Sequence, residues 1–244
     1  MNERPILIVH PHDRTTFFLE SVKRDLVTEF GNQIHYYSVK PNNNSHIDCL
    51  KRIRIHPNEG IIIFLGHGRS DKLFGAKSDG YNALLSQDFI NENPESQYYN
   101  DDFINEKNVN VFRGKKVFCL ACDSNSKISD YAIREGATAF LGFGNIPTSI
   151  DEMKYQKNVL GREFLDRLKG EVNYIIKRSL VYSLSTGRTF QGLLDILQLI
   201  CNQRITDILI KEKHFAWRHL LANTVYSIRS EVTVKGERNL KLMN

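Results

Sequence analysis

Short apolar runs alternate with amphipathic segments over the first 145 residues of the chain. Five runs are expected to be buried strands: residues 5–9, 34–39, 60–65, 115–120 and 138–142. After the first run, apolar side chains recur at three- and four-residue spacing and predict a helix that ends at Gly31: Leu19, Val22, Leu26 and Phe30. Two more helices are expected over residues 47–55 and 126–136. This alternation predicts an α/β fold, with a mainly parallel sheet that carries helices on both faces.

The rest of the chain has a different pattern. Residues 74–111 are polar and rich in Asn, Asp and Tyr, which predicts surface loops with a small hairpin or helix. From residue 151 onward the pattern is helical, and one apolar stripe over residues 190–209 predicts a helix that faces the core. Residues 225–234 are predicted to form one or two late strands.

We find no sequence signal of a domain boundary, and we expect one domain over residues 1–244. Its core sheet lies in residues 1–145, and residues 146–244 add a helical portion with the late strands. The composition, 41% hydrophobic and 25% charged, is ordinary for a globular protein. Because no apolar run is long enough to span a bilayer and the first residues lack a signal-peptide pattern, we expect a cytoplasmic protein without a membrane partner.

Charge and cysteine content narrow the function further. The net charge of +5 comes from residues 151–244, which hold 16 basic and 10 acidic side chains. A nucleic-acid partner is not favoured, because no nucleic-acid-binding motif accompanies this charge, and solvated helix faces are the simpler interpretation. Four cysteines in a chain of 244 residues do not form a small disulfide scaffold, so we expect reduced thiols.

Candidate chemistry follows two of the predicted strands. In parallel sheets, catalytic groups lie beyond the carboxyl ends of the strands. The run 60–65 is followed by Gly66-His67-Gly68, and the run 115–120 by Ala121-Cys122-Asp123-Ser124. An imidazole close to a thiol can accept its proton and later protonate a leaving amine. We therefore predict that His67 and Cys122 form a catalytic pair, with the backbone N–H groups of Gly68 and Cys122 as an oxyanion hole.

The order and spacing of these motifs resemble those of the CHAT domains, a branch of the caspase-like peptidases related to separase. That family has a strand that ends in His-Gly, a strand that ends in Ala-Cys followed by an acidic residue and Ser or Thr, and a further strand that begins after Gly-Ala, here Gly136-Ala137. Residues 217–236 show a weaker similarity to the end of the family domain. The resemblance implies a caspase-like three-layer α/β/α sandwich, with His67 as the catalytic histidine and Cys122 as the nucleophile.

The same resemblance implies a cysteine endopeptidase that needs no metal or cofactor and cleaves a protein substrate. Members of this family are often activated by a partner, commonly of the tetratricopeptide-repeat type. This chain has no such repeat, so a separate activating protein is expected. Regulated responses, including antiviral defence against phage, are the implied setting. The alternative is a catalytically idle scaffold of the same fold that binds a partner protein.

Two carboxylates near the predicted site are candidate substrate-binding groups. Asp13 follows the first strand, and Asp123 follows the predicted nucleophile. Either carboxylate can pair with Lys or Arg before the scissile bond, which is the preference we expect. Arg14 would instead favour an acidic residue there.

Other chemistry is less well supported by the sequence. Cys119 and Cys122 form a CxxC motif, but Cys119 falls inside a predicted strand and no second Cys or His pair completes a zinc site. His10 and His12 lack carboxylates at a clear metal-binding spacing, so loop histidines are favoured. The sequence has no Walker A run, no GxGxxG and no GxSxG elbow.

Overall fold

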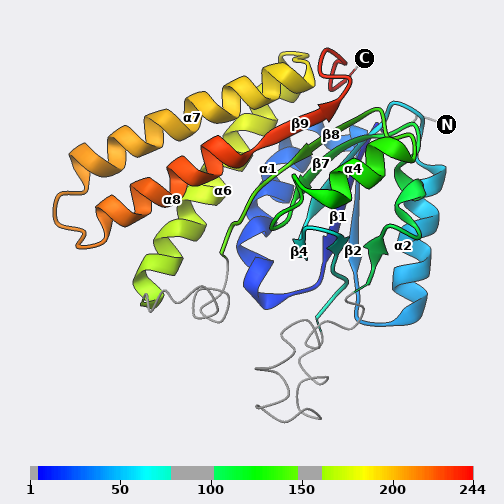
Figure 1. The fold of residues 1–244 in the computed structure, drawn as a ribbon, viewed down its shortest axis with the longest axis horizontal. Helices are drawn as coiled ribbons and strands as arrows, with labels where there is room; N and C mark the ends of the chain where they lie inside the picture. Colours follow the sequence, from blue (N-terminus) through cyan, green and yellow to red (C-terminus); the bar gives the residue numbers. More distant parts are fainter. Residues whose placement is uncertain (1–4, 78–101, 148–160, 244) are drawn as a thin grey trace, which may run out of the picture.

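A computed structural model describes residues 5–77, 102–147 and 161–243 of the chain (Figure 1). A six-stranded sheet forms its centre, with the strand order β2-β1-β3-β7-β8-β9. The strands are β1 (Ile6–Pro11), β2 (Ile34–Val39), β3 (Ile61–Leu65), β7 (Lys116–Leu120), β8 (Ala139–Gly142) and β9 (Thr233–Gly236). The first five are parallel to one another, and β9 is antiparallel to β8. The predicted α/β class with a mainly parallel sheet is confirmed.

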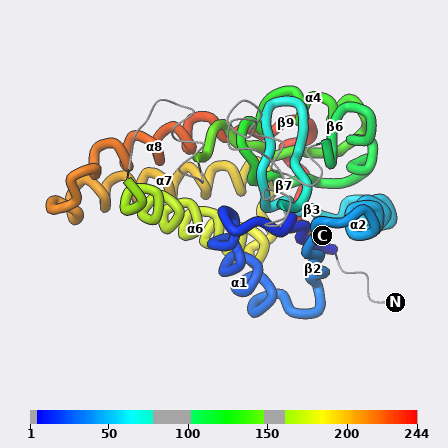
Figure 2. The backbone as a smooth tube through the Cα atoms, turned by 90° about the horizontal axis from the view of Figure 1, so that it is seen from below, coloured from blue at the N-terminus to red at the C-terminus, as the bar shows by residue number. Residues whose placement is uncertain are grey.

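Alternate residues of the strands face two separate apolar cores. On β1, Ile6 and Ile8 belong to the core that also contains side chains of α1 (Glu20–Phe30) and α6 (Arg162–Ser185). Leu7 and Val9 belong to the second core, with side chains of α2 (Asn43–Ile55) and α4 (Lys127–Arg134). Figure 2 shows α1 and α6 together, apart from α2 and α4. The four central strands are buried on both faces, which explains why each is a nearly continuous apolar run.

The order of the strands brings two loops together. After β1 the chain forms β2 on one side of β1 and then returns to form β3 on the other side. The loops that follow β1 and β3 therefore lie at the same edge of the sheet, where an open α/β sheet forms its ligand crevice. The loop after β1 continues into a 3-10 helix, η1 (Arg14–Leu19), and a second one, η2 (Gly31–Gln33), follows α1.

A small second sheet follows β3 and covers part of this edge. Its strands are β4 (Gly68–Arg69), β5 (Lys72–Leu73) and β6 (Ile104–Asn105), paired antiparallel in that order. A 3-10 helix, η5 (Val109–Phe112), leads from it to β7. The hairpin predicted in the polar segment 74–111 is not assigned, because residues 78–101 lie outside the described residues.

Three long helices form the C-terminal portion, as the sequence predicted. They are α6, α7 (Phe190–Lys211) and α8 (Arg218–Glu231), and Figure 1 shows the α7–α8 hairpin extending beyond the sheet. The predicted apolar stripe of α7 is mostly buried, although Leu209 is 38% exposed. One predicted boundary is wrong: residues 225–231 are helical, because Leu221, Val225 and Ile228 form a buried face at helical spacing. Only β9 remains of the late strands.

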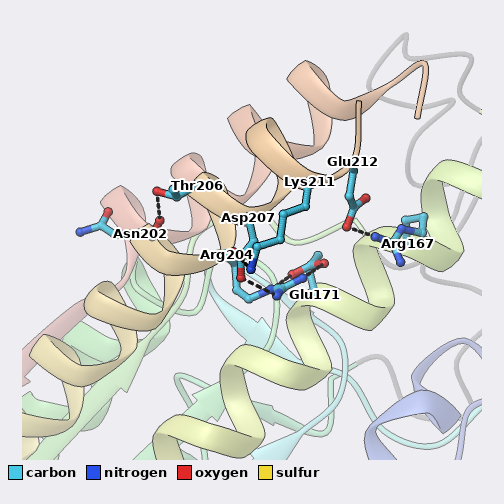
Figure 3. Close-up of polar contacts among 8 residues, drawn as sticks. All are labelled: Arg167, Glu171, Asn202, Arg204, Thr206, Asp207, Lys211 and Glu212. Carbon is cyan, nitrogen blue, oxygen red and sulfur yellow. Dashed lines mark hydrogen bonds and ion pairs between the residues drawn. The ribbon is translucent and has the colours of Figure 1, made fainter. Parts of the chain in front are cut away.

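Charged side chains join α6 to α7 (Figure 3). Two guanidinium nitrogens of Arg204 donate to the two carboxylate oxygens of buried Glu171, at 2.6 and 2.8 Å. Arg204 also pairs with Asp207, which is bound in turn by Lys211. A bidentate contact of this kind fixes the orientation of the two side chains as well as their distance. It therefore sets the register of α6 against α7.

The start of α2 differs from its prediction. The helix begins at Asn43 rather than near Ile47, because the Asn42 side chain accepts a hydrogen bond from the Ser45 N–H and caps the helix. Within the described part of the chain, no helix has both the length and the apolar character needed to cross a bilayer.

Candidate active site

His67 lies directly beyond the carboxyl end of β3 and is 5% exposed. Because β1 and β3 are neighbours, the loop after β1 reaches this histidine. The Nε2 atom of His67 lies 2.6 Å from Oγ1 of Thr15 and 3.3 Å from Oδ2 of Asp13. One ring nitrogen therefore faces a hydroxyl and a carboxylate.

Asp13 and Thr15 are hydrogen-bonded to each other at the start of η1. Asp13 is the N-cap of this helix, and its Oδ1 accepts hydrogen bonds from the Thr15 N–H at 2.7 Å and from the Thr15 hydroxyl at 2.8 Å. Since the hydroxyl proton points to Asp13, Thr15 Oγ1 presents a lone pair to His67. Both neighbours of Nε2 are then acceptors, so Nε2 carries the proton and neutral His67 has its lone pair on Nδ1.

The carboxylate of Asp13 is almost completely buried. Burial by itself would raise the pKa of Asp13, but the hydrogen bond and charge interaction with His67 and the bonds from Thr15 outweigh it and hold the pKa well below its usual range. Its Oδ2 is buried and accepts no hydrogen bond from the described residues, although His67 Nε2 lies beside it. A buried charge in this position is best balanced by a positively charged imidazole.

Cys122 lies beyond the carboxyl end of β7, the strand next to β3. Asp123 has a φ of 54°, a left-handed conformation that turns the chain sharply after the cysteine. The N–H of Asp123 donates to Gly144 O at 3.0 Å, and the N–H of Asn125 donates to Phe143 O at 3.0 Å. The cysteine loop is thereby bound to the loop that follows β8.

Ser124 is the side chain that holds these two loops together. It is fully buried, its Oγ donates to Cys119 O at 2.8 Å, and it accepts the Phe143 N–H at 2.9 Å. The sequence motif contained this serine, but its role required knowledge of the loop after β8. Its position explains why a small hydroxyl residue follows the Cys-Asp pair.

His67 and Cys122 line the same narrow pocket between η1, the sheet edge and α6. The cavity measures about 10 Å³, and its apolar walls include Leu120, Ile146 and Val172. The Cys122 thiol donates a hydrogen bond to the backbone oxygen of Ile146, with an Sγ–O distance of 3.0 Å. The conformation described here thus holds a protonated thiol and has no room for a peptide.

Gly68 lies where the small sheet meets the end of β7. The Phe74 N–H donates to His67 O, so His67 and Phe74 form a hydrogen-bonded pair of the antiparallel ladder. Hydrogen-bonded and non-hydrogen-bonded pairs alternate along such a ladder. The next pair, Gly68 and Leu73, is therefore non-hydrogen-bonded. The Gly68 N–H therefore points away from β5. A Cβ at this position would lie 2.9 Å from Lys72 O and 3.2 Å from the Cβ of Ala121. Only glycine fits without displacing these atoms.

The predicted substrate-binding carboxylates have different surroundings. The Asp13 carboxylate contacts His67 and Thr15 inside the protein, and substrate binding by Asp13 stays a prediction. Asp123 is half-buried next to Cys122, and burial raises its pKa. Substrate binding by Asp123 stays a prediction.

The residues considered for metal or redox chemistry are not brought together. All four cysteines are free, and Cys119 lies in the core on the α2 side of the sheet, whereas Cys122 packs against the core on the α1 side. His10 contacts Thr16 and Glu20, and His12 is exposed. The described ranges contain no group of three His, Cys, Asp or Glu side chains arranged to hold a metal ion.

Two residues of the site were missed by sequence reasoning. Thr15 follows Asp13 by two residues, a spacing typical of a side chain that caps a turn, and this signal was available in the sequence. Ile146 gave no signal, because it acts through its backbone oxygen.

Similarity to known proteins does not identify the site. No protein-family model, no curated protein and no solved structure matches this chain. The chemistry of the site is therefore interpreted from its own residues and their contacts.

Proposed function

We propose that this chain is a cysteine endopeptidase of the CHAT, caspase-like type, with Cys122 as nucleophile and His67 as general base and acid. One observation carries the proposal: the two side chains follow neighbouring parallel strands and line one pocket. The Nε2–H tautomer of His67 supports it further, because the basic nitrogen is then Nδ1, away from Asp13.

The reaction follows from these positions. The Cys122 thiol transfers its proton to Nδ1 of His67, and the thiolate sulfur forms a bond to the peptide carbonyl carbon. The carbonyl π electrons move to the oxygen, which the N–H groups of Gly68 and Cys122 would stabilise. The C–N bond then breaks as Nδ1–H protonates the leaving amine. Water, deprotonated by His67, releases the acyl group and restores the thiol.

Activation by a separate protein is part of the proposal. The thiol is bound to Ile146 O, and the cavity of about 10 Å³ is too small for a peptide. The segment around Ile146 must therefore move before a substrate can reach the thiol. A partner, in this family commonly a tetratricopeptide-repeat protein, would supply the required binding energy. A regulated cytoplasmic response such as antiviral defence is the setting that the resemblance implies.

The same closed pocket favours a second candidate function. An idle scaffold of this fold would keep its pocket shut in every complex and would bind its partner through other surfaces. The two functions differ in one requirement: the peptidase needs the Cys122 thiol, whereas partner binding by the scaffold does not.

Cleavage of a peptide library distinguishes the two functions. The purified chain, alone and with proteins that co-purify with it, is incubated with the library, and new amino termini are identified by mass spectrometry. New termini that disappear in Cys122→Ala, but persist in the control Cys201→Ala, support the peptidase. Absence of cleavage with a bound partner, together with partner binding that survives Cys122→Ala, supports the scaffold. A preference for Asp or Glu before the scissile bond would refute the predicted preference for Lys or Arg.

A further inference from the structure

We propose that Asp13 and Thr15 act as positioning residues for His67: together they hold it as the Nε2–H tautomer and stabilise its imidazolium form. The inference deepens the proposed peptidase function and rests on it, because His67 is the proposed base. It replaces the dyad by a group of three side chains, Cys122, His67 and Asp13, with Thr15 as the bridge between the last two.

The geometry fixes the direction of both hydrogen bonds of the Thr15 hydroxyl. Its hydroxyl donates to Asp13 Oδ1 at 2.8 Å and so must accept from His67, whose Nε2 lies 2.6 Å away. The backbone N–H of Thr15 donates to the same Oδ1 at 2.7 Å and helps to hold the Asp13 carboxylate in this orientation. The carboxylate and the hydroxyl therefore both select the tautomer that presents Nδ1 as the base.

The second carboxylate oxygen of Asp13 favours a positive charge on His67. Oδ2 is buried, accepts no hydrogen bond from the described residues and lies 3.3 Å from Nε2. An unsatisfied buried carboxylate oxygen is costly, and a positive imidazole next to it offsets that cost. When the Cys122 proton moves to Nδ1, the imidazolium gains this favourable contact, so the thiolate–imidazolium pair is stabilised.

His10 is another titratable group that interacts with His67. His10, on β1, interacts with His67 through charge, but burial lowers the pKa of His10 and keeps it mostly neutral at neutral pH. Its partners are Thr16 and Glu20, and Glu20 is also bound by Lys23 and Tyr36. Cys122 lines the same pocket as His67. Asp13 is therefore a charged group in direct contact with the His67 ring.

The experiment reads the tautomer directly and needs no substrate. The chain is labelled with 15N in its histidine side chains, and the His67 signals are assigned from their loss in His67→Gln. In the wild type, at a pH high enough for the His67 imidazole to be neutral, its 15N shifts should report a protonated Nε2 and an unprotonated Nδ1. Asp13→Asn and Thr15→Val should each mix the two tautomers, whereas Thr15→Ser, which keeps the hydroxyl, should retain the wild-type pattern. Asp123→Asn is the matched control for loss of a nearby carboxylate.

The alkylation rate of Cys122 by iodoacetamide, followed across pH, is the second readout. Asp13→Asn should lower this rate at neutral pH about tenfold or more, because both the tautomer and the ion pair are disfavoured. A wild-type His67 protonated on Nδ1, or a tautomer unchanged by Asp13→Asn, overturns the inference. A different result separates the two proposals. If the tautomer depends on Asp13 but His67→Ala leaves the alkylation rate of Cys122 unchanged, the positioning role of Asp13 stands and the proposed peptidase chemistry fails.

Discussion

The Cys122 thiol donates a hydrogen bond to the backbone oxygen of Ile146, with an Sγ–O distance of 3.0 Å, on the loop that follows β8. This contact stabilises the neutral thiol, since a thiolate would face the negative end of a carbonyl dipole. The resting thiol must therefore leave Ile146 O before it can act as the nucleophile that the mechanism requires. The loop after β8 therefore acts directly on the protonation of the thiol.

The Ile146→Ala variant should make Cys122 more reactive. The Ile146 side chain is 3% exposed and keeps its backbone oxygen in place, so its truncation should free the thiol. Loss of a hydrogen bond of about 1 kcal/mol corresponds to an alkylation rate about fivefold higher. Leu168→Ala is the control, because it removes an equally buried side chain of the same core that does not line the pocket. Equal rates in the two variants would show that general loosening, not release from Ile146, exposes the thiol.

Gly68→Ala should separate turnover from thiol reactivity. The added Cβ would meet Lys72 O at 2.9 Å and displace the amide of the proposed oxyanion hole. Peptide cleavage should fall about 100-fold, whereas alkylation of Cys122, which forms no oxyanion, should stay close to the wild-type rate. Gly170→Ala in α6 is the control, since a Cβ there meets nothing within 4 Å. A matching fall in cleavage and alkylation would argue against an oxyanion role for Gly68.

Ser124→Ala should destabilise the protein through the cysteine loop. The substitution leaves the buried Phe143 N–H without its acceptor and removes the bond to Cys119 O. We expect the free energy of unfolding in urea to fall by about 1–3 kcal/mol. Ser179→Ala, which removes one bond from an equally buried serine to a carbonyl of its own helix, should cost much less. Equal costs would contradict the proposed role of Ser124.

His56 should make stability depend on pH. Burial lowers the pKa of His56 to about 4, despite its hydrogen bond to Pro5 O, whereas the unfolded chain titrates at about 6.5. The unfolded state therefore binds the proton more readily, so this contribution to stability is complete above pH 6.5 and is lost as the pH falls towards 4. The loss should approach about 3 kcal/mol at pH 4.

Urea unfolding of the wild type and His56→Gln between pH 7 and pH 4 measures this contribution. Burial also lowers the pKa of His10 and His46, so the difference between the two chains is the informative quantity. The wild type should lose more stability than the variant over this interval. Parallel curves would contradict the expected neutral state of His56.

Sequence reasoning located the central strands along the chain well, because each of them is buried on both faces and leaves an apolar run. It also placed His67 and Cys122 at one edge, since parallel strands end together. It placed the late strands at residues 225–234, too early for β9, because pairing with β8 joins segments that are distant in the chain and carries no local signal. The Asp13–His67 contact was missed for the same reason: it depends on β1 and β3 being neighbours.

The most direct test of the account is the alkylation rate of each cysteine across pH, measured by mass spectrometry in Ile146→Ala and in the double variant Ile146→Ala/His67→Ala. Cys49, Cys119 and Cys201 are internal controls, because burial raises the pKa of each, that of Cys201 to about 12. The urea-unfolded chain supplies the intrinsic rate of each thiol. The account predicts that, once Ile146→Ala has released the thiol, Cys122 in the folded chain reacts faster than in the unfolded chain below pH 8, and that the added His67→Ala abolishes this excess. A folded Cys122 that reacts no faster than the unfolded thiol, with or without His67, would contradict it.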